Sequence, residues 1–265
     1  MHTPSPPPAS TGLWQVEGVP AFTDNYLWVI HDGTQAVLVD PGDGAPLQDY
    51  LTRRRLALRA ILCTHHHADH IGGVAALQAA FGPVPVYGPD DERLTGRTET
   101  VADGMTLALP PGDFQVLGVP GHTRSHLAYC WRDHLFCGDA LFALGCGRLF
   151  EGTPAQLLAA MDRFAGLPGE WWVHCAHEYT LSNLAFALAV DPDNPALQQR
   201  AVQERARRAV GRATVPSLLS AERATNPFLR ARDPAVRAAA ERWAGQPLAD
   251  ATAVVGALRA WKDGF

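Results

Sequence analysis

The stretch Thr64-His65-His66-His67-Ala68-Asp69-His70 decides most of what this sequence predicts. It brings four groups that bind metal ions when deprotonated into six positions: His65, His67, Asp69 and His70. The stretch follows the apolar residues 60–63, so a strand ending there would pass all four groups to one tight loop. His65 and His67, two positions apart in extended chain, point the same way, whereas Asp69 and His70 fall where the next helix would begin. We interpret the two orientations as two metal sites.

The donor types narrow the chemistry of these sites. Imidazole and carboxylate groups suit zinc, and also iron or manganese, whereas four thiolates would indicate a closed structural site. A histidine-rich surface tract, or a helix cap formed by Asp69, is the alternative interpretation. His66 should point away from its two neighbours, and we expect it to be structural.

Length and composition are those of an ordinary globular enzyme. A chain of 265 residues can form one large domain or two smaller ones, and no apolar stretch approaches the ~20 residues of a membrane span. The start of the chain lacks the basic and apolar regions of a secretory signal, and residues 1–12 are expected to be a disordered tail. The five cysteines form no C-x-x-C pair, which favours reduced thiols and a cytoplasmic location.

Charge is unevenly distributed along the chain. Residues 1–177 hold 18 acidic against 10 basic residues, and residues 178–265 hold 9 against 12. The basic second part could favour an anionic ligand, although solvated helix faces explain most of the excess. No basic stripe with interleaved aromatic residues suggests nucleic acid. Nothing in the sequence demands a dimer, and a monomer is expected.

The character of the chain changes near residue 177. Before it, the pattern predicts strands over residues 26–30, 36–39, 60–63, 84–87, 114–119, 127–131, 135–137 and 171–175, with helices over 47–56, 74–81 and 155–164. Thr153 and Pro154 should begin the last of these helices. After it, helices are expected over 180–190, 196–210, 234–244 and 248–261. We therefore predict a catalytic domain over 13–177, with sheets covered by helices, and a helical domain over 178–265.

Three further candidate ligands each follow a predicted strand. They are His122 in Gly121-His122-Thr123, Asp139 in Cys137-Gly138-Asp139 and His177 in Ala176-His177-Glu178. Strand ends in layered α/β folds converge on one edge, where loops can build a site. The set divides into His65, His67 and His122 for one metal and Asp69, His70 and His177 for a second. Asp139 would bridge the two metals.

These motifs resemble the metallo-β-lactamase superfamily, which implies a four-layered αβ/βα sandwich with the metals at one edge. More narrowly, the sequence is similar to the glyoxalase II (hydroxyacylglutathione hydrolase) family. The similarity is carried by Phe22-Thr23-Asp24-Asn25-Tyr26, by residues 145–152, by Ala176-His177-Glu178-Tyr179-Thr180, by Asn226-Pro227-Phe228 and by residues 259–263. It runs from about residue 13 to the end and implies a smaller all-helical C-terminal domain.

The resemblance implies a binuclear thioesterase that converts S-D-lactoylglutathione to glutathione and D-lactate, the second step of methylglyoxal detoxification. Two divalent ions, most simply zinc, could share a hydroxide as the nucleophile, oriented by Asp69 and held by the bridging Asp139. The resemblance places the tripeptide against Arg148, Tyr179, Arg259 and Lys262. Some relatives carry a lysine where this chain has Arg148, and a tyrosine where it has Phe150, so the contact with glutathione is expected to differ.

Three alternatives remain open on the sequence. A mononuclear-iron glutathione persulfide dioxygenase of the same fold would need fewer ligands than are present. A lactamase would not need the helical C-terminal segment. A non-catalytic metal-binding scaffold would be expected to lack ligands or to cover the site.

Overall fold

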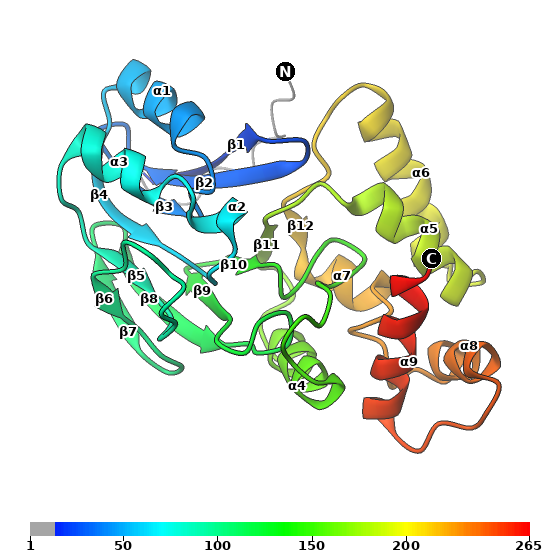
Figure 1. The fold of residues 1–265 in the computed structure, drawn as a ribbon. Helices are drawn as coiled ribbons and strands as arrows, with labels where there is room; N and C mark the ends of the chain where they lie inside the picture. The colour runs from blue at the N-terminus through cyan, green and yellow to red at the C-terminus, as the bar shows by residue number, and fades with distance from the viewer. Residues whose placement is uncertain (1–13) are drawn as a thin grey trace.

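The computed structural model describes residues 14–265, which form two six-stranded sheets packed face to face with helices on the outer sides (Figure 1). This arrangement confirms the four-layered α/β sandwich expected from the sequence. The N-terminal tail predicted for residues 1–12 lies outside the described residues.

The first sheet runs in chain order, and its strands change from antiparallel to parallel pairing at its third strand. Its strands are β1 (Gln15–Ala21), β2 (Asn25–His31), β3 (Gln35–Val39), β4 (Ala57–Leu62), β5 (Val86–Gly88) and β6 (Glu99–Thr100). Every residue of β2 is buried, because one of its faces packs on helices and the other on the second sheet.

The second sheet has the order β12-β11-β10-β9-β8-β7. Its strands are β7 (Thr106–Leu109), β8 (Gly112–Gly118), β9 (Leu127–Trp131), β10 (His134–Gly138), β11 (Trp172–Cys175) and β12 (Ser217–Leu218). β9 is antiparallel to both of its neighbours, and β11 is parallel to β10. As a result β8, β10 and β11 all end at the same edge of the sheet.

Helices cover the first sheet on its outer face and both sheets share one core. α1 (Gly44–Arg54) and α3 (Val74–Phe81) pack on Leu27 and Val29 of β2. The alternate residues Trp28 and Ile30 face the second sheet. Asp43 caps α1 by accepting a hydrogen bond from the Ala45 N–H. The short α2 (Ala68–Ile71) lies between them in sequence and carries part of the histidine-rich stretch.

α4 (Pro154–Ala165) packs on the second sheet, and its start confirms the predicted cap. The Thr153 side chain accepts a hydrogen bond from the Gln156 N–H, the Gln156 side chain reaches back, and Pro154 follows in the first turn. Leu157, Met161 and Phe164 face the shared core.

The chain after residue 177 is helical except for one short strand. Its helices are α5 (Thr180–Val190), α6 (Pro195–Ala209), α7 (Leu219–Thr225), α8 (Pro234–Ala244) and α9 (Ala251–Asp263). α9 begins later than the predicted residue 248 because Asp250 provides its N-cap. β12 pairs with β11, and α9 packs on α4, so the C-terminal segment shares the core of the second sheet.

All five cysteines are unpaired and buried, which agrees with the reduced thiols expected from the sequence. Within residues 14–265, none of the helices has the length and apolar character needed to cross a bilayer.

Candidate metal centre

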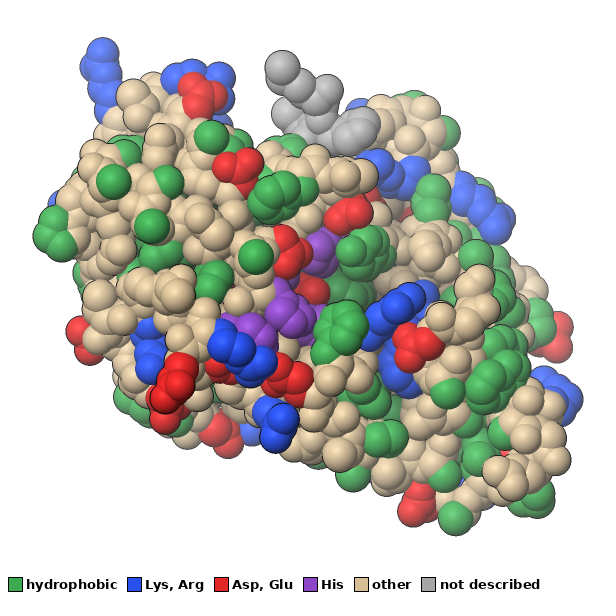
Figure 2. All heavy atoms as spheres, in the orientation of Figure 1, with side chains coloured by type: hydrophobic (Ala, Val, Ile, Leu, Met, Phe, Trp, Pro, Cys, Tyr) green, Lys and Arg blue, Asp and Glu red, His purple; other side chains and the backbone are tan. Residues whose placement is uncertain are grey.

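Four loops bring the seven predicted ligands together at one edge of the sandwich. The histidine-rich stretch follows β4 and enters α2, whereas His122, Asp139 and His177 follow β8, β10 and β11. Figure 2 shows the histidines in a hollow, bordered by acidic, basic and apolar side chains. His67 and Asp69 remain partly exposed while the other five are buried, so the site is open on one side.

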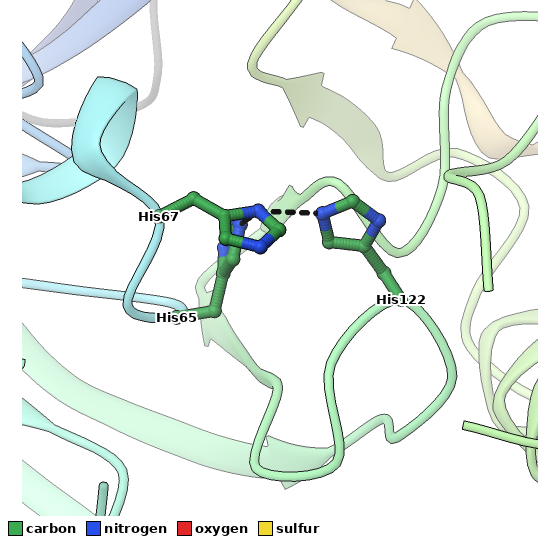
Figure 3. Close-up of side chains that lie close together, drawn as sticks. All are labelled: His65, His67 and His122. Atoms are coloured by element: carbon green, nitrogen blue, oxygen red, sulfur yellow. Dashed lines mark hydrogen bonds between the residues drawn. The ribbon is translucent and has the colours of Figure 1, made fainter. Parts of the chain in front are cut away.

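Three imidazoles form the first group of donors. The Nδ1 atom of His67 lies 3.0 Å from the Nε2 atom of His65 and 3.0 Å from that of His122, and Figure 3 shows the three rings converging from two loops. Nitrogen ligands at 2.0–2.1 Å from a tetrahedral zinc ion are about 3.3 Å apart. The triangle is therefore close to the size that a divalent cation requires.

Asp139 lies between the first group and a second one. Its Oδ2 atom is 3.5 Å from the Nε2 atom of His122, while its Oδ1 atom is 3.3 Å from that of His70 and 3.4 Å from that of His177. Asp69 completes the second group, with its Oδ2 atom 3.3 Å from the Nε2 atom of His177. The two carboxylate oxygens of Asp139 thus face different sets of donors, as a bridging ligand requires.

In the first group, hydrogen bonds on the side of the rings away from the site leave the nitrogen that faces the site unprotonated. The Nδ1 atom of His122 lies 2.9 Å from the backbone carbonyl of Arg148, which can only accept, so the proton sits on Nδ1 and Nε2 carries a lone pair. Thr64 donates its hydroxyl to Asp40 and lies 3.0 Å from the Nδ1 atom of His65. The hydroxyl oxygen is then free to accept from His65, with the same result.

Carboxylates orient the second group in the same way. The Nδ1 atom of His70 is 3.0 Å from Asp40, and that of His177 is 2.7 Å from Asp24. Carboxylate–histidine pairs of this kind fix the ring and raise the basicity of the nitrogen that faces the metal. Asp40 also accepts the Thr64 N–H at 2.7 Å and holds a left-handed φ of 51°, a conformation that a site keeps only when its surroundings enforce it.

The electrostatics differ between the two groups. Burial and the neighbouring imidazoles lower the pKa of His65 well below its usual value and that of His67 to about 4. For His177, burial is outweighed by the nearby carboxylates of Asp139 and Asp69, which raise its pKa to about 10. Burial acts against the ionised form of Asp139, yet His70 and His177 hold the pKa of this carboxyl well below its usual range. The first group thus holds neutral imidazoles, whereas in the second group ionised carboxylates face protonated imidazoles, which would release their protons when a metal binds.

Two unsatisfied atoms test whether a metal fits. The Nε2 atom of His70 and the Oδ1 atom of Asp139 are buried and have no hydrogen-bond partner among the described residues, although they lie 3.3 Å apart. Buried polar atoms without partners are costly unless a ligand satisfies them. Both lie beside the second group of donors, where a divalent cation would satisfy them, so the residues present fit a pair of divalent cations, one at each group.

Glycines allow the loops to approach this closely. A Cβ atom on Gly42 would lie 1.7 Å from the backbone oxygen of Asp69, and one on Gly147 would lie 2.2 Å from that of Asp139 and 2.8 Å from the Nδ1 atom of His122. These positions exclude any side chain, so the backbone itself supports the ligands.

We expect the replacement Asp40→Asn to weaken metal binding about 10–100-fold, the usual effect of losing an outer partner. Asp40 accepts the Thr64 N–H with one oxygen and faces the Thr64 hydroxyl and His70 Nδ1 with the other, and an amide has only one oxygen for the two positions. With the amide nitrogen toward His70, this ring would carry its proton on the nitrogen that faces the metal. Metal content per chain measures the effect. Asp43→Asn is the matched control because asparagine caps a helix as well as aspartate; equal metal content in the two variants would contradict the prediction.

The four predicted substrate contacts lie in different environments. Arg148 is exposed, with its Nε atom 3.6 Å from Asp263, and Tyr179 stacks on the His177 ring with centroids 4.6 Å apart. The Nζ atom of half-buried Lys262 lies 5.2 Å from the centre of the Phe186 ring. Arg259 is buried and donates to backbone carbonyls. The structure therefore brings three of the four to a surface where a ligand can reach them.

Phe150 and His66 border the centre without joining it. The Phe150 ring is 62% exposed and lies against the rings of His67 and His122. His66 turns away from the donors toward Asp91 and Glu151, at 3.3 and 3.6 Å. This orientation agrees with the structural role expected for His66.

Sequence reasoning did not identify the outer partners Asp24, Asp40 and His126. The His126 ring stacks on His65 with centroids 4.6 Å apart, and its Nε2 atom accepts the Asp139 N–H at 3.3 Å. Asp24 lies in the stretch 22–26 that carries part of the family resemblance, and Asp40 directly follows β3. Their positions in the sequence were the only indication of a role at the site. Aspartates are so common in turns that this indication does not identify a partner of a ligand.

Two family models match the chain, one over its first part and the other over its C-terminal part. The description "Metallo-beta-lactamase superfamily" matches residues 22–177, and "Hydroxyacylglutathione hydrolase C-terminus" matches residues 178–265. A curated protein named hydroxyacylglutathione hydrolase from Cupriavidus taiwanensis is 52% identical over 96% of this chain and 100% of its own length. One of the same name from Xanthomonas campestris pv. campestris is 53% identical over 95% of this chain and 99% of its own.

Solved structures show the same fold. The BLEG-1 B3 metallo-β-lactamase is 26% identical with a TM-score of 0.62, covering 81% of this chain and 99% of that one. The protein ETHE1 from Myxococcus xanthus is 31% identical with a TM-score of 0.55, covering 63% and 76%. A protein named TTHA1623, crystallised in a di-iron-bound form, is 32% identical with a TM-score of 0.52, covering 61% and 91%.

Proposed function

Because the chain belongs to the hydroxyacylglutathione hydrolases, within the metallo-β-lactamase superfamily, we propose that it hydrolyses S-D-lactoylglutathione to glutathione and D-lactate at the centre described above. The observation that carries this proposal is the position of Asp139, whose two oxygens face two separate donor groups. His65, His67 and His122 are the proposed ligands of one cation, and Asp69, His70 and His177 those of the other. Asp139 is the proposed bridge.

Two divalent cations held by this set would supply a water of lowered pKa and a Lewis acid for the thioester carbonyl. We propose zinc, with iron or manganese as alternatives for the same nitrogen and oxygen donors. The di-iron form of a structural relative supports a binuclear site. A thiol with a pKa near 8.5 leaves as a thiolate, so the chain need not provide a strong general acid.

Asp69 is the proposed orienting group for the attacking water. Its carboxyl is partly exposed, and its Oδ2 atom accepts a hydrogen bond from the Asn25 amide at 3.1 Å. Burial acts against ionisation, but the contacts with His177 and His70 keep the pKa of Asp69 below its usual value. The group therefore stays ionised and can accept a hydrogen bond from water.

Tyr179, Arg148 and Lys262 are the proposed contacts with glutathione. Burial and nearby carboxylates raise the pKa of Tyr179 to about 12, so its hydroxyl remains a donor. Arg148 and Lys262 supply positive charge for the carboxylates of the tripeptide. We propose residues 178–265 as the substrate-binding part and residues 13–177 as the catalytic part, acting as a monomer in the cytoplasm; the five buried free thiols are consistent with that compartment.

Steady-state hydrolysis of S-D-lactoylglutathione, with metal analysis on the same sample, tests the proposal. We expect turnover and about two metal ions per chain. An S-lactoyl thioester of a small thiol without the tripeptide is the matched substrate, and it should show a lower kcat/KM with the same metal content. Oxygen uptake with glutathione persulfide, in the absence of thioester hydrolysis, would contradict the proposal.

The pH profile of kcat/KM should report Lys262. Burial and the neighbouring Arg259 lower the pKa of Lys262 to about 8. The ammonium is then present below pH 8 and lost above it, so we expect kcat/KM to fall as the pH rises through about 8. Profiles of kcat/KM report groups of the free enzyme.

Two variants at this position control the pH prediction. Lys262→Met should start lower and lack the fall above pH 8, whereas Lys262→Arg, whose charge persists, should move the fall out of range. Groups at the metal centre titrate alike in all three proteins. A fall near pH 8 that persists in Lys262→Met would assign it to another group.

A further inference from the structure

We propose that Arg259, in the C-terminal helix α9, is a positioning residue that holds the segment 146–148 and through it the ligands His122 and Asp139. The residue is 4% exposed, and its Nη1 atom donates to the backbone oxygen of Cys146 at 2.8 Å and lies 3.4 Å from that of Gly147. Its Nη2 atom pairs with Asp263 at 3.0 Å. Its Nη1 atom is thus directed at the backbone of residues 146–147 and its Nη2 atom at Asp263, while its Nε atom has no hydrogen-bond partner among the described residues.

The segment that Arg259 holds is the one that touches the ligands. The Gly147 N–H donates to the backbone oxygen of Asp139 at 3.0 Å, and the Arg148 carbonyl accepts from the Nδ1 atom of His122 at 2.9 Å. The Cys146 carbonyl that Arg259 binds and the Gly147 N–H that binds Asp139 belong to one peptide unit, and the Arg148 carbonyl that binds His122 is two units further on. Rotation of these peptide planes would move both ligands together.

Arg259 gives the segment its buried polar contact with α9, beside an exposed ion pair between Arg148 and Asp263. Gly147 cannot carry a side chain because its Cβ would meet Asp139 and His122, so its backbone lies directly against the ligands. Without the guanidinium, the Cys146 carbonyl would be buried near the end of α9 with no donor from this residue, at the full desolvation cost of a polar group. Arg259 thus couples the end of the chain to the metal centre.

A direct contact with substrate and a positioning role predict different results. Loss of a direct contact raises KM and leaves the metals unchanged. Loss of a positioning residue lowers kcat and metal affinity by about 10–100-fold, with KM within about threefold. The inference rests on the proposed function only for its kinetic part, because metal affinity can be measured without any substrate.

The experiment compares Arg259→Met, Arg259→Lys and Arg237→Met. Metal affinity is measured by competition with a chromogenic chelator, the ligand geometry by the visible spectrum of the cobalt-substituted protein, and kcat and KM with S-D-lactoylglutathione. Arg259→Met should lose metal affinity, shift the cobalt spectrum and lose kcat, and Arg259→Lys should recover part of each, since an ammonium can donate to one carbonyl. Arg237 also donates to a backbone carbonyl, that of Leu248, far along the chain from the ligands, and its variant should keep wild-type metal affinity.

Wild-type metal affinity and cobalt spectrum in Arg259→Met would overturn the proposal, whether KM rises or not. If this variant does not fold, Arg259→Lys and Gly147→Ala decide: the latter disturbs the same segment from the ligand side and should give the same spectral shift and loss of affinity. Wild-type values in both would overturn the proposal. If neither the wild type nor any variant hydrolyses the thioester, the proposed function is wrong. The measurements of metal affinity and cobalt spectrum still test the positioning role of Arg259.

Discussion

Replacing Asp139 with alanine should release both metal ions and lower hydrolysis by at least about 10³-fold. The carboxylate has one oxygen 3.5 Å from His122 and the other 3.3 Å from His70, so its removal takes a donor from each group at once. The buried imidazoles would then face each other without a negative charge between them. Metal analysis after gel filtration and kcat with S-D-lactoylglutathione measure the loss.

Two further variants make this result specific. Asp139→Asn keeps the shape and one oxygen, and should fall between wild type and alanine in metal content. Asp133→Ala removes a half-exposed aspartate from the turn before β10 and should behave as wild type. If Asp139→Ala kept one tightly bound metal and most of the activity, the bridging role would be wrong.

Removal of the metals with a chelator should abolish thioester hydrolysis while leaving the fold in place. The two main apolar clusters fill the space between the sheets and under α1 and α3, and their burial stabilises the fold without the cations. The melting temperature should nevertheless fall, because ligands that bind only the native state stabilise it. Circular dichroism, thermal melting and turnover of the same stripped sample make the measurement.

Adding back metal completes this test. Zinc, iron and manganese are supplied separately, and we expect activity to return with at least one of them while calcium does not restore it, because calcium takes oxygen ligands. Full activity in stripped protein would exclude a metal-dependent reaction.

The sequence predicted those elements whose apolar pattern is long and regular. Residues 74–81 and 234–244 form helices with the predicted bounds, and the buried strand β2 appeared as a continuous apolar run. β1 was missed because Gly18 and Pro20 interrupt its pattern. β12 and α7 were missed because two and seven residues give too few periods to recognise.

For the metal centre, the sequence predicted which residues meet but not what supports them. Each ligand follows a strand, and strand ends share an edge, so their convergence follows from topology. The partners Asp24 and Asp40 are ordinary turn aspartates until the coordinates show which ring each one faces. The burial of Arg259 was also beyond prediction, because a basic residue in the last turn of a helix is usually solvated.

The pairing of β12 with β11 bears on how this protein can be divided. The last strand of the second sheet is supplied by Ser217 and Leu218, so a shortened chain ending near residue 177 would leave the backbone groups of β11 without their partner. Such an unprotected edge recruits strands from other molecules. A gene fragment encoding only the ligand-bearing part should therefore yield a product that aggregates, and the two parts have to be expressed as one polypeptide.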